Sequence, residues 1–374
     1  MQTLPRLPRS LRNLGRRLLA SRPARALAGP HDVDHYLELI HPRAAVHAVR
    51  GEVTDVRHLT ARSVTLTIRP TSAWRGFRAG QHVRVTVEVG GVRHSRSYSP
   101  AASEYAHDRI ELTITAHPEG VVSRHLQARA RPGMVLGLSQ ADGDFVLPRP
   151  RPERLLLISG GSGITPVMSM LRTLCAEGHE GEVVFLYYAR GPEEAIYARE
   201  LAALAREHPN VRLVRAHTRA DASAGELAGH FSREHLLSAV GEHAEVETYV
   251  CGPSPLVDAV HAVWAEDGLE QRLHPERFTL TTTPAAPGDE EGGRVLFSTS
   301  ELRVESDGGP LLEQAERAGL APAYGCRMGI CRTCTCRKLS GAVRDLRSGE
   351  VSSPGDEEIQ PCVSVPVGEV AVEI

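Results

Sequence analysis

Three cysteines near the C-terminal end of this 374-residue chain have a tight spacing, C-x4-C-x2-C, at Cys326, Cys331 and Cys334. A fourth, Cys362, follows after a gap long enough to hold two strands. This is the plant-type spacing of four thiolates around a [2Fe–2S] cluster. Such a cluster moves one electron at a time and does no bond chemistry itself. The rest of the chain should therefore indicate where electrons come from and where they go.

Two alternatives to an iron–sulfur cluster fit the cysteines less well. Structural zinc usually takes its cysteines as two close C-x2-C pairs, whereas here three cysteines gather and the fourth stands alone. A disulfide framework is typical of small secreted proteins, and this chain is long and has no secretion signal. Cys336 is a fifth cysteine close by. We interpret it as a bystander, because the ligand spacing is complete without it.

Length and composition narrow the class of protein. A chain of 374 residues should hold two or three domains, and 41% hydrophobic residues with mixed charges is ordinary for a globular protein. No run approaches the roughly 18 apolar residues that a membrane span requires. Reduced thiols and an iron–sulfur site predict a cytoplasmic protein. We expect no nucleic-acid partner.

Residues 1–45 are predicted to be a basic extension with a short lead-in helix at 31–42. The first 30 residues contain seven arginines and no acid. Leu11, Leu14 and Leu18 would share one helical face among these arginines, which favours peripheral contact with anionic lipid or an acidic partner. The alternative is a disordered basic tail, which the prolines of this segment favour.

The next two segments differ in hydrophobic pattern. Residues 46–150 alternate Val, Thr, Leu and Ile between Gly and Pro breaks, which predicts a small antiparallel β-barrel. Residues 151–280 alternate apolar strands with helical segments, including one expected helix within 192–207. This alternation predicts a parallel sheet covered by helices on both faces.

The last part of the chain follows a predicted linker at 281–293, which is rich in Pro, Gly and acidic residues. Residues 294–374 should hold a hairpin, a short helix, the cysteine loop and closing strands.

A glycine-rich stretch, GGSGITP at 160–166, follows a buried strand and opens a helix. Backbone N–H groups and the positive helix end would face a pyrophosphate there. The stretch differs from the usual G-x-G-x-x-G fingerprint, so a tight strand-to-helix turn without a ligand is the alternative.

Five motifs occur in one order: RSYS at 96–99, GVVS at 120–123, GGSGITP, CGP at 251–253 and the cysteine set. In residues 46–374 the chain therefore resembles the ferredoxin–NADP reductase superfamily, in the branch with a C-terminal plant-type ferredoxin domain. The overall texture is most similar to actinobacterial reductases that serve acyl-CoA desaturases. The resemblance implies a flavin-binding β-barrel, an α/β nicotinamide-dinucleotide domain and an α+β domain of the β-grasp type.

The resemblance also implies roles in flavin binding. Arg96 would hold flavin phosphate through its planar fork, Tyr98 would lie against the isoalloxazine ring, and Ser99 would hydrogen-bond near N5. Ser97 belongs to the same motif. A helix beginning after a glycine would present N–H groups to a pyrophosphate, which favours FAD over FMN; its residues are Gly120, Val121, Val122 and Ser123.

A second group of residues matches the family's nicotinamide site. Glu276 and Phe278 match an acid and an aromatic near the other face of the flavin, although Phe278 is also compatible with a core residue. Cys251 taken alone is more often a small buried hydrophobe, but Gly-Pro after it favours a place beside the nicotinamide. The matching positions are Gly160, Gly161, Gly163, Thr165, Pro166, Cys251, Gly252 and Pro253.

Coenzyme choice depends on the ribose 2′-position, where Arg favours the phosphate of NADPH and an acid favours NADH. Arg190 ends the second parallel strand, and Thr218 and Arg219 end the third, where relatives place a Ser-Arg phosphate contact. Glu193 and Glu194 close to Arg190 weaken the argument. NADPH is predicted, with NADH as the alternative.

The resemblance implies an electron-transfer chain from NADPH through FAD and the [2Fe–2S] cluster to an oxygen-activating metalloenzyme. We expect a membrane acyl-CoA or fatty-acid desaturase as acceptor. A soluble oxygenase, either a ring hydroxylase or a CoA-thioester epoxidase, is the alternative. A non-enzymatic redox sensor is a third hypothesis, but a sensor would need no nicotinamide domain.

Overall fold

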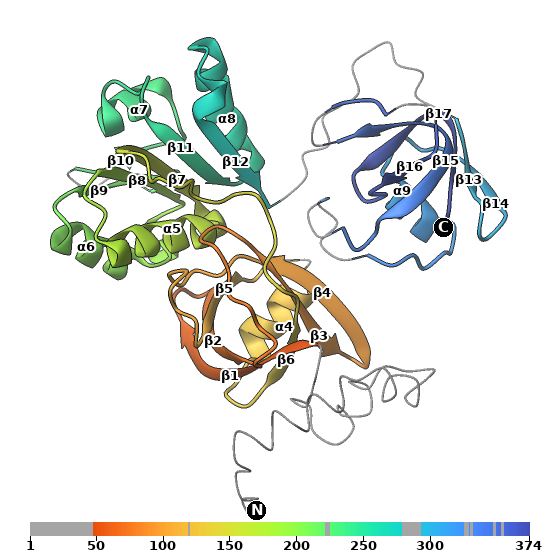
Figure 1. Ribbon diagram of the computed structural model, residues 1–374, viewed down its shortest axis with the longest axis horizontal. Coiled ribbons are helices and arrows are strands. Elements are labelled where there is room, and N and C mark those ends of the chain that lie inside the picture. Colours follow the sequence, from red (N-terminus) through yellow and green to blue (C-terminus); the bar gives the residue numbers. More distant parts are fainter. Residues whose placement is uncertain are drawn as a thin grey trace, which may run out of the picture.

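The computed structural model describes residues 48–118, 120–220, 225–278, 293–324, 329, 332–346, 349–352 and 355–374. The basic extension, the expected helix at 31–42 and nearly all of the expected linker lie outside the described residues. Three sheets organise the part of the chain that is described, and each has its own hydrophobic core (Figure 1).

The first sheet is an antiparallel barrel of six strands in the order β4-β3-β6-β1-β2-β5. Pro100, just after β4, bridges Leu112 of β5, so the two edges of the sheet meet. Helix α4 (Val121–Arg129) packs Val122 and Leu126 into the barrel core. The predicted barrel is confirmed. Its strands are β1 (Val49–His58), β2 (Ser63–Pro70), β3 (Val83–Val89), β4 (Val92–Tyr98), β5 (Ile110–Thr115) and β6 (Val135–Leu138).

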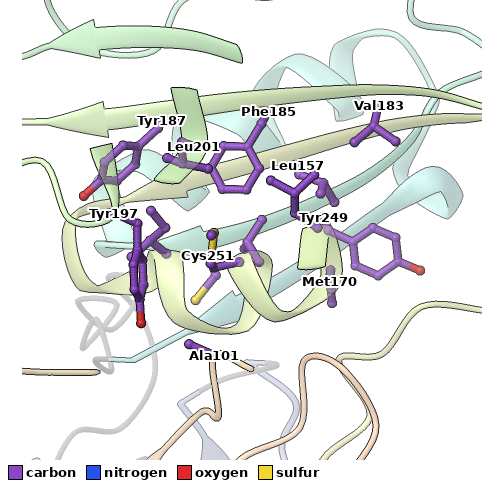
Figure 2. Close-up of a cluster of buried hydrophobic side chains, with 14 of the residues drawn as sticks. Ala101, Leu157, Met170, Val183, Phe185, Tyr187, Tyr197, Leu201, Tyr249 and Cys251 are labelled. Atoms are coloured by element: carbon purple, nitrogen blue, oxygen red, sulfur yellow. The ribbon is translucent and has the colours of Figure 1, made fainter. Parts of the chain in front are cut away.

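The second sheet is parallel, in the order β10-β9-β8-β7-β11-β12. Leu155 and Leu157 of β7 face one core with helices α5 and α6, and Leu156 and Ile158 face the other core with α7 and α8. Figure 2 shows the first core, where Leu157 and Phe185 lie above Met170 of α5. Both faces of the sheet are therefore covered, as predicted.

The elements of this parallel sheet have the following bounds. The strands are β7 (Arg154–Gly160), β8 (Glu182–Ala189), β9 (Val211–His217), β10 (Leu227–Ala228), β11 (Glu247–Gly252) and β12 (Leu273–Arg277). The helices are α5 (Ile164–Glu177), α6 (Ala198–Glu207), α7 (Arg233–Val240) and α8 (Ser254–Glu266), with short 3-10 turns η1 (Gly161–Gly163), η2 (Pro192–Glu194) and η3 (Glu270–Arg272).

One expected helix is shorter than its pattern indicates. Only η2 forms early in the stretch 192–207, and α6 begins at Ala198. Tyr197 has a left-handed backbone, with φ of 58°. Its buried hydroxyl donates to Glu111 at 3.2 Å and also hydrogen-bonds to Thr113, both on β5 of the barrel. Anchoring this side chain in the neighbouring domain overrides local helix propensity.

The third sheet is mixed, in the order β14-β13-β17-β15-β16. Strands β13 and β17 are parallel, whereas β13–β14, β15–β16 and β15–β17 are antiparallel. Helix α9 packs Leu311 and Ala315 against it, which gives the expected α+β arrangement. The elements are β13 (Arg294–Phe297), β14 (Leu302–Glu305), α9 (Leu311–Arg317), β15 (Cys336–Asp345), β16 (Glu357–Ile359) and β17 (Ser364–Val372).

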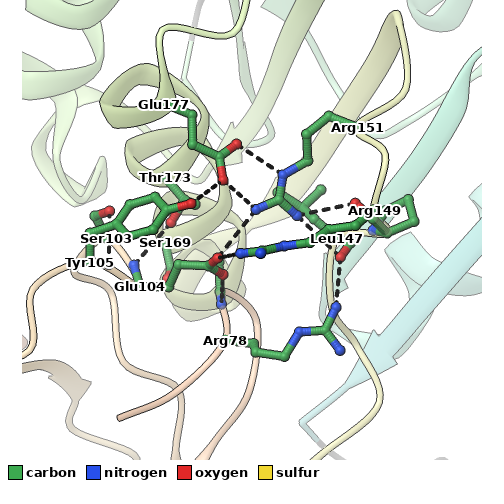
Figure 3. A network of polar contacts seen from close by, with 12 residues as sticks. Arg78, Ser103, Glu104, Tyr105, Leu147, Arg149, Arg151, Ser169, Thr173 and Glu177 are labelled. Carbon is green, nitrogen blue, oxygen red and sulfur yellow. Dashed lines mark hydrogen bonds and ion pairs between the residues drawn. The ribbon is translucent and has the colours of Figure 1, made fainter.

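A polar network joins the barrel to the parallel sheet (Figure 3). The buried carboxylate of Glu104 accepts from the N–H of Ala79 at 2.9 Å and from Arg149 at 2.7 Å. Arg151 contacts Glu104 at 3.3 Å and Glu177 of α5 at 2.6 Å. Charges buried in this way must be paired, so the network favours one arrangement of the two domains.

Candidate cofactor sites

Strand β4 carries the motif expected to bind flavin. Alternation along the strand puts Arg96 and Tyr98 on one face and Ser97 on the other. The hydroxyls of Ser97 and of the fully buried Ser99 have no hydrogen-bond partner among the described residues. Buried polar groups are normally satisfied, so these two hydroxyls indicate a polar ligand. Burial also raises the pKa of Tyr98, so its phenol stays neutral.

The N-terminus of helix α4 lies one strand further along the chain. Gly120 occupies the cap position, and within the described chain no side chain caps the helix. A Cβ on Gly120 would approach the hydroxyl oxygen of Ser123 to 2.3 Å. Val122 is buried in the barrel core and Val121 is exposed, so these residues offer their N–H groups rather than side chains. The first-turn N–H groups can receive an anion such as pyrophosphate.

The glycine turn after β7 packs directly on the segment after β11. A Cβ on Gly163 would approach the carbonyl oxygen of Cys251 to 2.4 Å, and one on Gly160 would approach Pro253 to 3.0 Å. A Cβ on Gly252 would in turn lie 3.1 Å from the nitrogen of Gly160. Only residues without side chains allow this approach. The structure therefore brings together two motifs that lie far apart in the sequence, at the carboxyl edge of the sheet where such folds bind ligands.

The remaining residues of the glycine motif complete this turn. Gly161 has a φ of 55°, in the left-handed region that favours glycine. Thr165 and Pro166 are buried in the first turn of α5, and the hydroxyl of Thr165 donates to the carbonyl of Ser162 at 3.4 Å. Their side chains hold the turn, which leaves backbone N–H groups for an anion.

Cys251 and Glu276 are cross-strand neighbours on β11 and β12. The Sγ of Cys251 donates to Oε2 of Glu276 over 3.8 Å. Burial, and then the Glu276 charge, raise the pKa of the Cys251 thiol. Burial raises the pKa of Glu276 to about 8, although its side chain keeps some solvent access. Phe278 is partly buried against the same core as Cys251.

The residues expected to choose the coenzyme lie at the carboxyl ends of β8 and β9. The N–H of Arg219 donates to the carbonyl of Arg190 at 2.9 Å, and the N–H of Thr218 donates to that of Ala189 at 2.9 Å. Both arginines are exposed, and Arg190 lies 3.5 Å from Glu194. The expected opposition between Arg190 and an acid is therefore present, whereas Arg219 extends from the neighbouring strand end.

The cluster site is described in part, because Cys326 and Cys331 lie outside the described residues. Cys334 and Cys362 are both buried and pack with Leu312 and Val363. The N–H of Gly329 donates to the Sγ of Cys362 at 3.3 Å. This is the inward-pointing N–H that an anionic iron–sulfur site needs, so the described residues fit the cluster.

One residue in this region was missed by the sequence reasoning. Arg84 of β3 donates a hydrogen bond from Nη1 to Oγ1 of Thr333 in the cysteine loop. The two residues are 249 positions apart. An arginine within an alternating strand carries no local signal that marks it as a contact to another domain.

Comparison with known proteins identifies all three parts of the chain. Family models match an oxidoreductase FAD-binding domain at residues 52–146, an oxidoreductase NAD-binding domain at 157–262 and a 2Fe-2S iron-sulfur cluster binding domain at 297–367. An NADPH oxidoreductase of Mycobacterium tuberculosis is 38% identical over 347 residues, which cover 91% of this chain and 88% of the relative.

Two further comparisons extend over most of the chain. The glycine betaine monooxygenase reductase subunit of Chromohalobacter salexigens is 29% identical and covers 79% of this chain and 87% of its own length. The solved structure of phthalate dioxygenase reductase, which is described as carrying electrons from pyridine nucleotides to [2Fe-2S], aligns with a TM-score of 0.58 at 22% identity. That alignment covers 87% of this chain and 97% of the other.

Fold, sites and comparisons define an NAD(P)H-dependent flavin and iron–sulfur oxidoreductase. The chain belongs to the ferredoxin–NADP reductase superfamily, in the branch with a C-terminal [2Fe–2S] domain. Its cofactors are FAD, a nicotinamide dinucleotide and a [2Fe–2S] cluster. None of the helices in the described ranges is long and apolar enough to cross a bilayer.

Proposed function

We propose that this chain is an NADPH-dependent reductase that delivers single electrons to an oxygen-activating enzyme. The observation that carries the proposal is the close packing of the glycine turn on Cys251, beside Glu276, in a chain that also carries a flavin motif and a cluster loop. Bound FAD takes two electrons as a hydride and releases them singly, and the cluster carries one electron at a time.

The residue roles expected from the family resemblance form part of this proposal. Arg96, Tyr98 and the unsatisfied hydroxyls of Ser97 and Ser99 bind flavin. The N-terminus of α4 binds the pyrophosphate. Cys251, Glu276 and Phe278 lie beside the reacting rings, where burial excludes water. The proposed domains are 46–150 for FAD, 151–280 for the nicotinamide dinucleotide and 294–374 for the cluster, with a linker at 281–293.

We infer that the coenzyme is NADPH. Arg219 is exposed at the end of β9, with its backbone tied to Arg190, so both guanidinium groups start from one edge of the sheet. A planar guanidinium suits a bidentate contact to phosphate. Glu194 lies near Arg190 and reduces its attraction for an anion, so Arg219 is the principal candidate. The printed name of the relative at 38% identity, an NADPH oxidoreductase, supports this choice.

The acceptor that we propose is a membrane acyl-CoA or fatty-acid desaturase. The resemblance to desaturase reductases and the basic segment 1–30, which would favour loose contact with the inner membrane face, support it. A soluble oxygenase is the second candidate. It is supported by relatives named as reductase subunits, including those of glycine betaine monooxygenase and of 1,2-phenylacetyl-CoA epoxidase.

The decisive experiment offers one purified reductase to several acceptors. Steady NADPH-dependent reduction of cytochrome c is expected, and its absence would contradict the reductase function and favour a redox sensor. Desaturase-containing membranes and a soluble ring-hydroxylating oxygenase are then compared under equal NADPH. Faster NADPH consumption coupled to product with the membranes supports the desaturase. Coupling with the soluble oxygenase alone would assign the second candidate.

A further inference from the structure

Arg84 is held firmly in the strand that neighbours the flavin motif. It pairs with Ser97 across the antiparallel strands β3 and β4. Its N–H donates to the hydroxyl of Ser139 at 2.8 Å, and its carbonyl accepts from the N–H of Ser139 at 2.9 Å. Directly opposed residues of antiparallel strands project from the same face. The side chains of Arg84 and Ser97 therefore leave the barrel together, from a backbone that is fixed on both sides.

The far end of the Arg84 side chain lies in the cluster domain. Its Nη1 donates to Oγ1 of Thr333, and Thr333 directly precedes the buried Cys334. The side chains of Arg84 and Thr333 are both partly buried at this contact. A single side chain thus connects the strand beside the flavin motif with the loop that carries the cluster ligands.

Without specific contacts, domains joined by a linker rich in Pro and Gly are expected to move relative to one another. Electron tunnelling falls off steeply with distance, so transfer from flavin to cluster needs an arrangement in which the two domains are close. We propose that Arg84 is a positioning residue for this step, and that it holds the cluster loop against the flavin-binding strand. The inference rests on the flavin-to-cluster transfer of the proposed function.

The chemistry of the contact explains why arginine suits this position. A guanidinium presents several N–H donors in a rigid plane at the end of a long stem, whereas lysine has one rotating ammonium. A charge-assisted hydrogen bond is also stronger than a neutral one. Arg84→Lys should therefore restore the contact only in part.

The test separates three steps in full-length protein carrying its FAD and cluster. In stopped-flow mixing with NADPH, Arg84→Ala should leave flavin reduction unchanged and slow cluster reduction by about tenfold, the loss expected for one charge-assisted contact. Ferricyanide reduction, which can draw electrons from the flavin directly, should stay at the wild-type rate. Arg84→Lys should fall between the two. Thr333→Val should match Arg84→Ala, and adding it to Arg84→Ala should slow the step no further.

Two measurements guard against trivial outcomes. Arg69→Ala removes another arginine of the barrel, one that pairs with Glu52 at 2.7 Å, and should leave cluster reduction unchanged. Hydrogen exchange in the resting oxidised protein should be faster at residues 332–336 in Arg84→Ala than in wild type. Equal cluster reduction in Arg84→Ala and wild type, or equal slowing of flavin and cluster reduction, would overturn the inference. A wild-type flavin that NADPH does not reduce would contradict the proposed function instead.

Discussion

The thiol of Cys251 lies 3.8 Å from a carboxylate oxygen of Glu276, and the two residues face each other across neighbouring parallel strands. Burial keeps the thiol protonated and raises the pKa of Glu276 to about 8. At neutral pH this pair is therefore mainly uncharged. A hydride donor and a flavin ring beside it would meet a polar but neutral surface, which holds a proton close to the expected site of reaction.

The first prediction concerns pH and stability. Because the pKa of Glu276 is near 8 in the folded protein and near the ordinary 4.5 when unfolded, its ionisation opposes folding increasingly as pH rises from about 4.5 to 8. Glu276→Gln removes this effect. Urea unfolding should give the variant little advantage at pH 5 and about 1–4 kcal/mol at pH 9.

The control for this prediction is Glu270→Gln, which changes an exposed acid in the 3-10 turn before β12. That variant should follow the wild-type dependence on pH. If Glu276→Gln and wild type lose stability in parallel between pH 5 and pH 9, the raised pKa is wrong.

The second prediction concerns the glycine turn. Gly163 has an ordinary helical backbone, so alanine there is opposed only by the carbonyl of Cys251, which a Cβ would meet at 2.4 Å. Gly163→Ala should cost about 3 kcal/mol and abolish measurable NADP⁺ binding. Gly161→Ala meets open space but adopts a φ of 55°, so it should cost only about 1 kcal/mol. Calorimetric titration and urea unfolding would measure both, and similar costs for the two variants would contradict this packing argument.

The third prediction concerns coenzyme choice. If Arg219 contacts the 2′-phosphate, Arg219→Ala should raise KM for NADPH by roughly ten- to hundred-fold, the loss of about 1.5–3 kcal/mol of charge-assisted bonding. KM for NADH should change little. Arg212→Ala, at the opposite end of β9, is the matched control and should affect neither coenzyme. Equal increases for NADPH and NADH would remove Arg219 from this role.

The fourth prediction concerns the cluster ligands. Cys336 lies on β15 and packs against the core of the third sheet, whereas Cys334 and Cys362 pack together elsewhere. Cys336→Ser should therefore keep its iron and sulfide, and Cys362→Ser should lose them while retaining flavin. Metal analysis and visible absorption spectra measure both. A Cys336 variant without iron would make the ligand assignment wrong.

The fifth prediction concerns the basic segment. Each arginine near an anionic surface contributes about 1 kcal/mol, and the attraction fades with salt. Deleting residues 1–30 should leave NADPH–cytochrome c activity unchanged, weaken sedimentation with anionic liposomes and slow delivery to a membrane-bound acceptor. Undiminished liposome binding by the shortened protein would exclude a membrane role for this segment.

The general architecture could be predicted because each part of the chain has a local signature. Alternation from Val49 to Thr115 indicates half-buried strands, and apolar strands alternating with helices from Arg154 to Arg277 indicate a covered parallel sheet. The cysteine spacing predicts the cofactor of the last part. These patterns depend on residues that are close in the chain, so the sequence by itself determined the order and type of the three folds and their cofactors.

Tertiary structure alone decided which distant residues meet. Gly163 lies against the Cys251 carbonyl because two loops converge at one sheet edge, and Tyr197 is left-handed because its hydroxyl is anchored in the barrel. Arg84 reaches Thr333 across 249 positions. The energies of these contacts depend on the packing of elements that periodicity does not place relative to one another. Hydrophobic spacing reports which face of a strand or helix is buried, but not which side chain it is buried against.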